Sequence, residues 1–220
     1  MHRWGIGFYF PDGSAHVEKS AEEAWVSQGY EMLARSVKSH IIVAHLRLAS
    51  RGDICDRYCH PFKLHFLGRD WLFAHNGDCR SIINYQTSGA RIEGTESHDS
   101  PRIFEYLRDR ILEYLRARPT RRLFGAVRRA TQRLLREYPD GTFNFLLTNG
   151  NVLFAHVDRR HPRNRALYVL RREKGDRLAL LVTTVPNLTS EDWVSFAPTG
   201  RHRRKLLMIS DGELLYNGDI

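Results

Sequence analysis

Three segments of the chain each lead from apolar residues to polar side chains, and this repeated pattern constrains the fold most. Residues 41–52 pass through His45 and Arg47 to a glycine, residues 60–62 read His-Pro-Phe, and residues 73–77 read Phe-Ala-His-Asn-Gly. Short apolar runs predict buried strands, and polar groups that follow a strand are presented where the sheet ends. The sequence therefore predicts a sheet whose reactive groups gather in a cleft at its edge.

The order of the expected elements predicts the fold class. Strands group toward both ends of the chain and two long helices lie between them, which favours an α+β fold of antiparallel sheets over a parallel βαβ sheet. Two stacked sheets flanked by helices, a four-layer αββα sandwich, fit this order. Strands are expected over 4–10, 14–18, 41–48, 62–67, 71–76, 142–149, 151–157, 166–172, 177–185, 193–197 and 205–210, and helices over 21–37, 99–118 and 120–138.

Composition limits the class of protein. The 220 residues are 42% hydrophobic and 27% charged, which predicts one globular domain over 1–220. No apolar run reaches the roughly 18 residues of a membrane span, and no secretory leader is apparent, so a cytoplasmic protein without membrane contact is expected. Three cysteines cannot build a disulfide framework, which agrees with a reducing compartment.

The net charge of +9 raises nucleic-acid binding as an alternative. The basic residues are scattered, and one group lies on a predicted helix whose other face is apolar, so the sequence does not favour nucleic acid as the partner. A non-catalytic module that binds an acidic partner or nucleic acid remains the alternative function. The basic runs are 121–122, 128–129, 159–160, 171–172 and 201–205.

Four residues near the strand ends have polar groups suited to binding an amide substrate. Asn76 can offer a side-chain N–H and Gly77 a backbone N–H to a developing oxyanion, although Asn-Gly is also a common turn. Arg47 lies in an apolar run, where a guanidinium needs a carboxylate partner unless the strand is an exposed edge. Asp99 precedes a proline-led helix and has an ordinary explanation as its cap. His45 and His75 are interpreted as histidines near the core whose ring nitrogens are hydrogen-bonded, rather than as metal ligands.

Taken together, these segments resemble the glutamine-binding domain of class II glutamine amidotransferases, which belong to the N-terminal nucleophile (Ntn) hydrolases. Residues 4–9 resemble the family's early strand, 60–62 its His-Pro-Phe loop, and 183–189 with Trp193 the closing segment of its compact, stand-alone members. The resemblance covers nearly the whole chain and implies the four-layer sandwich.

The resemblance also implies roles for the candidate residues. Asn76 and Gly77 would form the oxyanion hole, Arg47 would bind the α-carboxylate of glutamine, and Asp99 would bind its α-ammonium. His75, which belongs to the family's His-Asn-Gly segment, joins the substrate-binding set. The ligand would be glutamine or a γ-glutamyl amide, with no cofactor and no metal.

The chain also departs from the family pattern. It starts Met1-His2-Arg3-Trp4, so the family's first strand with its nucleophilic cysteine has no counterpart, and Tyr58 stands where the loop usually has Asn. We therefore expect an N-terminally truncated fold and impaired amide hydrolysis. We also expect an unpaired sheet edge that is prone to self-association, and a homodimer is one form that such association would take. The missing start has two explanations, an incorrectly assigned start of the gene and a true loss of the first strand.

Two further alternatives concern the same residues. Cys55-x-x-x-Cys59-His60 and His75-x-x-x-Cys79 contain soft metal ligands, but structural zinc sites more often use closer pairs. A γ-glutamyl hydrolase that acts on a thiol metabolite would use the same pocket as a glutaminase.

Overall fold

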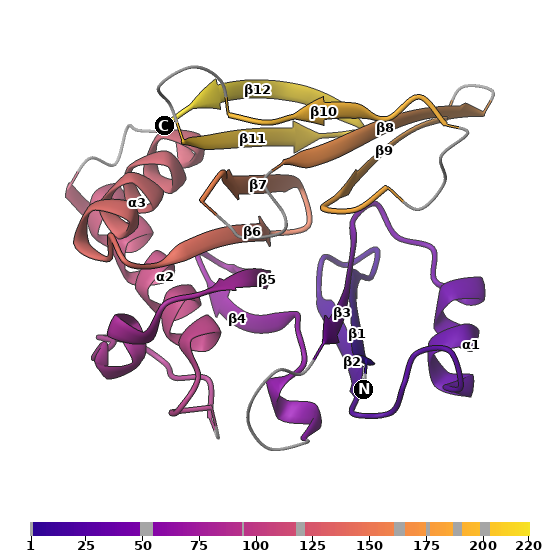
Figure 1. Cartoon of the computed structure of the whole chain (residues 1–220), viewed down its shortest axis with the longest axis horizontal. Coiled ribbons are helices and arrows are strands. Elements are labelled where there is room, and N and C mark those ends of the chain that lie inside the picture. The colour runs from indigo at the N-terminus through magenta and orange to yellow at the C-terminus, as the bar shows by residue number, and fades with distance from the viewer. Residues whose placement is uncertain are drawn as a thin grey trace.

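The structure is a computed structural model that describes residues 2–48, 55–93, 95–117, 122–160, 166–174, 177–186, 191–198 and 203–220. The described residues form the predicted α+β fold, with three α-helices and with three antiparallel sheets where two stacked sheets were expected. Figure 1 shows these elements as layers, with α2 and α3 on one flank and α1 on the other.

The central layer is a six-stranded sheet in the order β12-β11-β7-β6-β5-β4. The turn between its strands β6 and β7 is the predicted Asn-Gly turn, in which Gly150 has a φ of 86°, a conformation that glycine adopts readily. The strands are β4 (Phe62–Phe66), β5 (Arg69–Asp78), β6 (Thr142–Thr148), β7 (Val152–Asp158), β11 (Arg204–Ser210) and β12 (Glu213–Asp219).

Two helices cover one face of this sheet, α2 (Asp99–Ala117) and α3 (Leu123–Glu137). Their apolar positions recur at helical spacing and bury the main core, in which the rings of Phe73 and Phe104 stack with centroids 5.1 Å apart. Among the described residues, no helix is long and apolar enough to cross a membrane.

The opposite face of the large sheet packs against two smaller sheets. One has the order β2-β1-β3, and Tyr9 and Ala15 from it pack on Leu72 of β5. The other has the order β10-β8-β9 and packs on Ala155 and Val157 of β7. The second sheet layer of the sandwich is thus formed by two three-stranded sheets. Their strands are β1 (His2–Tyr9), β2 (Ala15–Ser20), β3 (Ile42–Leu48), β8 (Leu167–Lys174), β9 (Arg177–Thr183) and β10 (Val194–Phe196).

Helix α1 (Gln28–Ser36) forms the outer layer and differs from the prediction. The expected helix over 21–37 begins only at Gln28, because the Ser27 hydroxyl caps it by accepting the N–H of Tyr30. Trp25 and Met32, two apolar residues of the expected helix whose spacing suggested an inward face, are 64% and 69% exposed. The helix packs on β1 through Tyr30 and its neighbours instead.

Candidate functional site

The end of β5 carries Asn76 on the face between the sheets. Side chains alternate along the strand, so Trp71, Phe73 and His75 point toward the helices, and the first two lie in the main core. Leu72 belongs to the other set and packs against the small sheet of β1–β3. Asn76 shares this second face and is half-buried.

Gly77 is fixed by the strand pairing itself. A Cβ at this position would lie 1.9 Å from the carbonyl oxygen of Thr142 and 2.6 Å from Nε2 of His75. No side chain fits between β5 and β6 here, so the close approach of the two backbones requires glycine.

His75 lies on the helix side of the sheet and joins three elements. Its Nε2 donates to the Thr142 carbonyl at 3.1 Å, and its Nδ1 lies 3.0 Å from the Ser100 hydroxyl of α2. The ring is 3% exposed, and burial lowers the pKa of His75, which favours the neutral imidazole. The ring therefore braces β5 and β6 against the start of α2, behind Asn76 and Gly77.

Asp99, the first residue of α2, reaches back to the end of β5. Its Oδ2 accepts the backbone N–H of Cys79 at 2.8 Å, and Cys79 follows directly after the last residue of the strand. The carboxylate is half-buried, and its Oδ1 lies 3.2 Å from the Ser100 hydroxyl oxygen. The structure thus brings Asp99 next to the Asn76–Gly77 strand end, across a gap of some twenty residues in sequence.

Arg47 lies on β3, in register with Arg3 of β1. The side chain of Arg47 lies outside the described part of the chain, whereas that of Arg3 is described and only 1% exposed. Arg3 was not singled out from the sequence. The sequence signal for it is that Arg3 and Gly5 are two residues apart and so share one face of β1. Gly5 has no side chain, and this leaves room for the backbone carbonyl of His60.

The loop over residues 55–61 contacts both sheet layers. The His60 ring meets His45 of β3 at 4.5 Å between centroids. The Tyr58 ring stacks on His98, the residue before Asp99, at 3.7 Å. The sequence singles out Tyr58 only as a departure from the family's loop and gives His98 no role, because nothing in their spacing predicts a contact across forty residues of chain.

The three cysteines differ in environment. Cys59 and Cys79 are each 1% exposed, and burial raises the pKa of the Cys79 thiol to about 11. Cys55 is half-exposed, and the Arg57 guanidinium donates to its sulfur at 3.0 Å, which lowers the pKa of that thiol. Over the ranges that the structure describes, no three His, Cys, Asp or Glu side chains are grouped to hold a metal.

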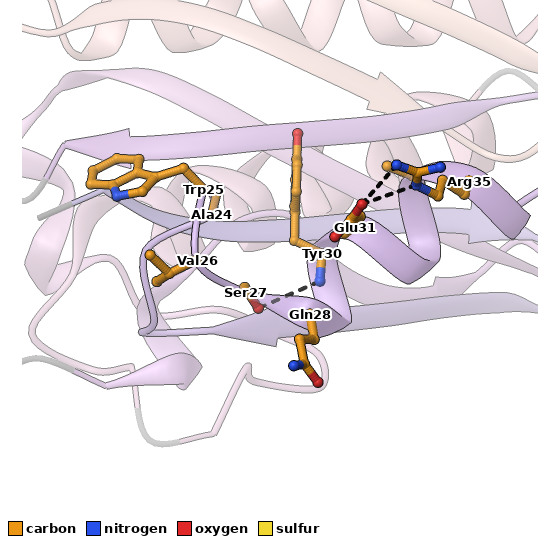
Figure 2. Close-up of a pocket in the computed structure, with 9 residues that line it drawn as sticks. Ala24, Trp25, Val26, Ser27, Gln28, Tyr30, Glu31 and Arg35 are labelled. Carbon is orange, nitrogen blue, oxygen red and sulfur yellow. Dashed lines mark hydrogen bonds and ion pairs between the residues drawn. The ribbon is translucent and has the colours of Figure 1, made fainter.

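A hollow of about 450 Å³ lies elsewhere, beside α1. Figure 2 shows Trp25, Tyr30 and Glu31 around it, with Glu31 bonded to Arg35. None of the five predicted site residues lines this hollow, so it is separate from the strand-end site.

The αββα layering defines the fold class as that of solved amidotransferases. The sequence profile of the class-II glutamine amidotransferases matches residues 1–218. The chain belongs to this family, which confirms the resemblance inferred from the sequence.

Individual relatives support the assignment. A Haemophilus influenzae protein whose name assigns it provisionally to the glutamine amidotransferases is 27% identical over 218 residues, covering 90% of this chain and 72% of the relative. YafJ of Escherichia coli, with a similarly provisional name, is 30% identical over 155 residues, covering 70% of this chain and 59% of its own length.

Solved structures share the fold. The chain superposes on a glutamine aminotransferase class-II domain protein from Silicibacter pomeroyi with a TM-score of 0.67 at 21% identity, covering 99% of this chain and 91% of that one. Glutamine phosphoribosylpyrophosphate amidotransferase from Bacillus subtilis gives a TM-score of 0.60 at 16% identity, covering 99% of this chain and 42% of that one.

Proposed function

We propose that this chain binds glutamine or a γ-glutamyl amide where β5 ends and α2 begins. Asp99 binds the α-ammonium group, Arg47 the α-carboxylate, and Asn76 and Gly77 provide the donors for the amide oxygen. The observation that carries the proposal is the bond from the Cys79 N–H to Asp99, because it holds the carboxylate beside the Asn76–Gly77 strand end.

The residue types match a zwitterionic ligand. A guanidinium and a carboxylate on separate elements recognise the two opposite charges of an amino acid, and each charge-assisted contact is stronger than a neutral hydrogen bond. His75, predicted as substrate-binding, acts in this proposal from behind the strand, where its bonds to Ser100 and Thr142 hold Asn76 and Gly77 in place.

Hydrolysis needs a nucleophile and a base besides these groups. Neither buried cysteine suits this role, because Cys79 holds its proton tightly and Cys59 is enclosed. Cys55 has a lowered thiol pKa, but its described partner is the Arg57 guanidinium, which cannot act as a base. We infer that the 220-residue chain binds its ligand and hydrolyses the amide slowly.

The proposal is tested by calorimetric titration of L-glutamine into the chain and three variants. Arg47→Gln and Asp99→Asn should each weaken binding about tenfold or more, the effect of losing one charge-assisted contact. Arg35→Gln is the matched control, because Arg35 is an exposed arginine on α1 with a side chain 79% accessible. Its affinity should equal that of the parent chain.

Two results would count against the proposal. Absence of L-glutamine binding by the parent chain removes the site assignment. Ammonia release at a rate of several per second from the same chain removes the inference that its cysteines are poor nucleophiles. Comparing L-glutamine with γ-glutamyl amides of thiol metabolites in the titration distinguishes the two ligand classes.

A further inference from the structure

One aromatic contact joins the two sheet layers beside the proposed site. The rings of Tyr58 and His98 stack with centroids 3.7 Å apart and planes inclined by 18°. Tyr58 ends a short 3-10 helix over Asp56–Tyr58, and His98 directly precedes Asp99. The stack therefore connects the loop of residues 55–61 to the start of α2.

The Tyr58 side of the contact is anchored on the small sheet of β1–β3. Asp56 accepts the backbone N–H of Ala21, just after β2, at 2.5 Å. The Cys59 thiol lies 3.6 Å from the Ser20 carbonyl oxygen at the end of the same strand. These bonds on either side of Tyr58 tie the loop to the layer that also contains Arg47.

The His98 side is anchored on the large sheet. The His98 N–H donates to the Thr95 carbonyl at 3.0 Å, and the Thr95 hydroxyl donates to the Ile92 carbonyl at 2.6 Å. Asp99 is bonded to Cys79 at the end of β5. His98 directly precedes Asp99, so the stack holds the chain just before the residue that carries the carboxylate.

Two hydrogen bonds between these layers lie at the far end of β5. The Tyr9 hydroxyl donates to the Thr148 carbonyl at 2.9 Å, and the Ala15 N–H donates to the Asp70 carboxylate at 2.9 Å. Asp70 is near the beginning of β5, whereas Asn76 is near its end. The stack holds the layers at the opposite end, where the ligand would lie.

We propose that Tyr58 and His98 are positioning residues that set the spacing between the Arg47 layer and the Asp99 carboxylate. This inference rests on the proposed function and adds a determinant of ligand choice. A ligand with both an α-carboxylate and an α-ammonium contacts Arg47 and Asp99 at once, so its affinity depends on the spacing between these two charged groups. A ligand that lacks the ammonium makes no contact with Asp99, so its affinity depends on this spacing much less.

The test compares L-glutamine with glutaramate, which is glutamine without its α-amino group, by calorimetric titration. In the parent chain the preference for L-glutamine should be about tenfold, from the contact with Asp99. Tyr58→Leu, which removes the aromatic ring, should reduce this preference to about twofold and change glutaramate affinity less than twofold. Tyr58→Phe keeps the ring and should keep the preference.

The outcomes separate the two proposals. Loss of the preference in Asp99→Asn but not in Tyr58→Leu leaves the proposed function standing and overturns the positioning role. An equal loss of both ligands in Tyr58→Leu shows a merely structural role and also overturns it. Binding of neither ligand by the parent chain overturns the proposed function and this inference together. Where Tyr58→Leu fails to fold, His98→Leu breaks the stack from the other side and carries the same expectation.

Discussion

Replacing Gly77 with alanine tests whether β5 and β6 approach as closely as the structure shows. The added Cβ would lie 1.9 Å from the Thr142 carbonyl oxygen, against about 3.3 Å for an ordinary C···O contact. The Thr142 atom is backbone inside a paired strand, so relief needs the two strands to separate by about 1 Å. Overpacking of this kind costs about 3 kcal/mol of unfolding free energy.

The assay is urea unfolding, supported by thermal unfolding, where Gly77→Ala should lower Tm by about 6 to 12 °C for a chain of this size. Gly125→Ala is the matched control. Gly125 lies in α3, and its added Cβ would have the Tyr114 hydroxyl as its nearest described neighbour, at 3.9 Å, so this change should stabilise the fold by about 0.5 kcal/mol. A Gly77→Ala protein within 0.5 kcal/mol of the parent would refute the reasoning.

Three other predictions concern buried or reactive groups. Burial lowers the pKa of His156 to about 4. The free energy of unfolding should therefore fall by at most about 3 kcal/mol as the pH drops from about 6.5 toward 4. In urea unfolding at several pH values, the His156→Gln variant should show a flatter pH dependence than the parent chain. Asp109 accepts three hydrogen bonds from residues 85–88, so Asp109→Ala should cost about 3 kcal/mol in urea unfolding and expose that loop to protease; unchanged stability and protease resistance would contradict this. Arg57 lowers the pKa of the Cys55 thiol, so Cys55 should react with iodoacetamide at pH 7.5 well before Cys79. Peptide mass spectrometry measures the order of the two reactions. The reverse order would contradict the lowered pKa of Cys55 and the raised pKa of Cys79.

The sequence predicts most elements of the fold because its signals are local. The apolar run before Asn76, the proline-led start of α2 and the Asn-Gly turn before β7 each identify an element from a few neighbouring residues. The start of α1 is predicted too early because apolar residues before Ser27 imitate helical spacing while the chain there forms turns. Strand β12 was missed, since its residues are exposed or half-buried and lack a strong apolar alternation.

The candidate site is less accessible from sequence because it depends on distant contacts. That Asp99 meets the end of β5 follows from a bond to Cys79, which only the packing of α2 on the sheet determines. Burial of Arg3 and the stacking of Tyr58 on His98 likewise arise where two layers meet. The roles of these residues came from the resemblance to the family. From the sequence pattern alone, Asn76 and Gly77 could equally form a turn, Arg47 could lie on an exposed edge strand, and Asp99 could cap a helix.

A crystal structure of the chain soaked with L-glutamine tests the central claim most directly. The account predicts the ligand between β3 and the start of α2, with its carboxylate at Arg47, its ammonium at Asp99 and its amide oxygen at Asn76 and Gly77. Ligand density elsewhere, or a head group that contacts neither charged side chain, would contradict it.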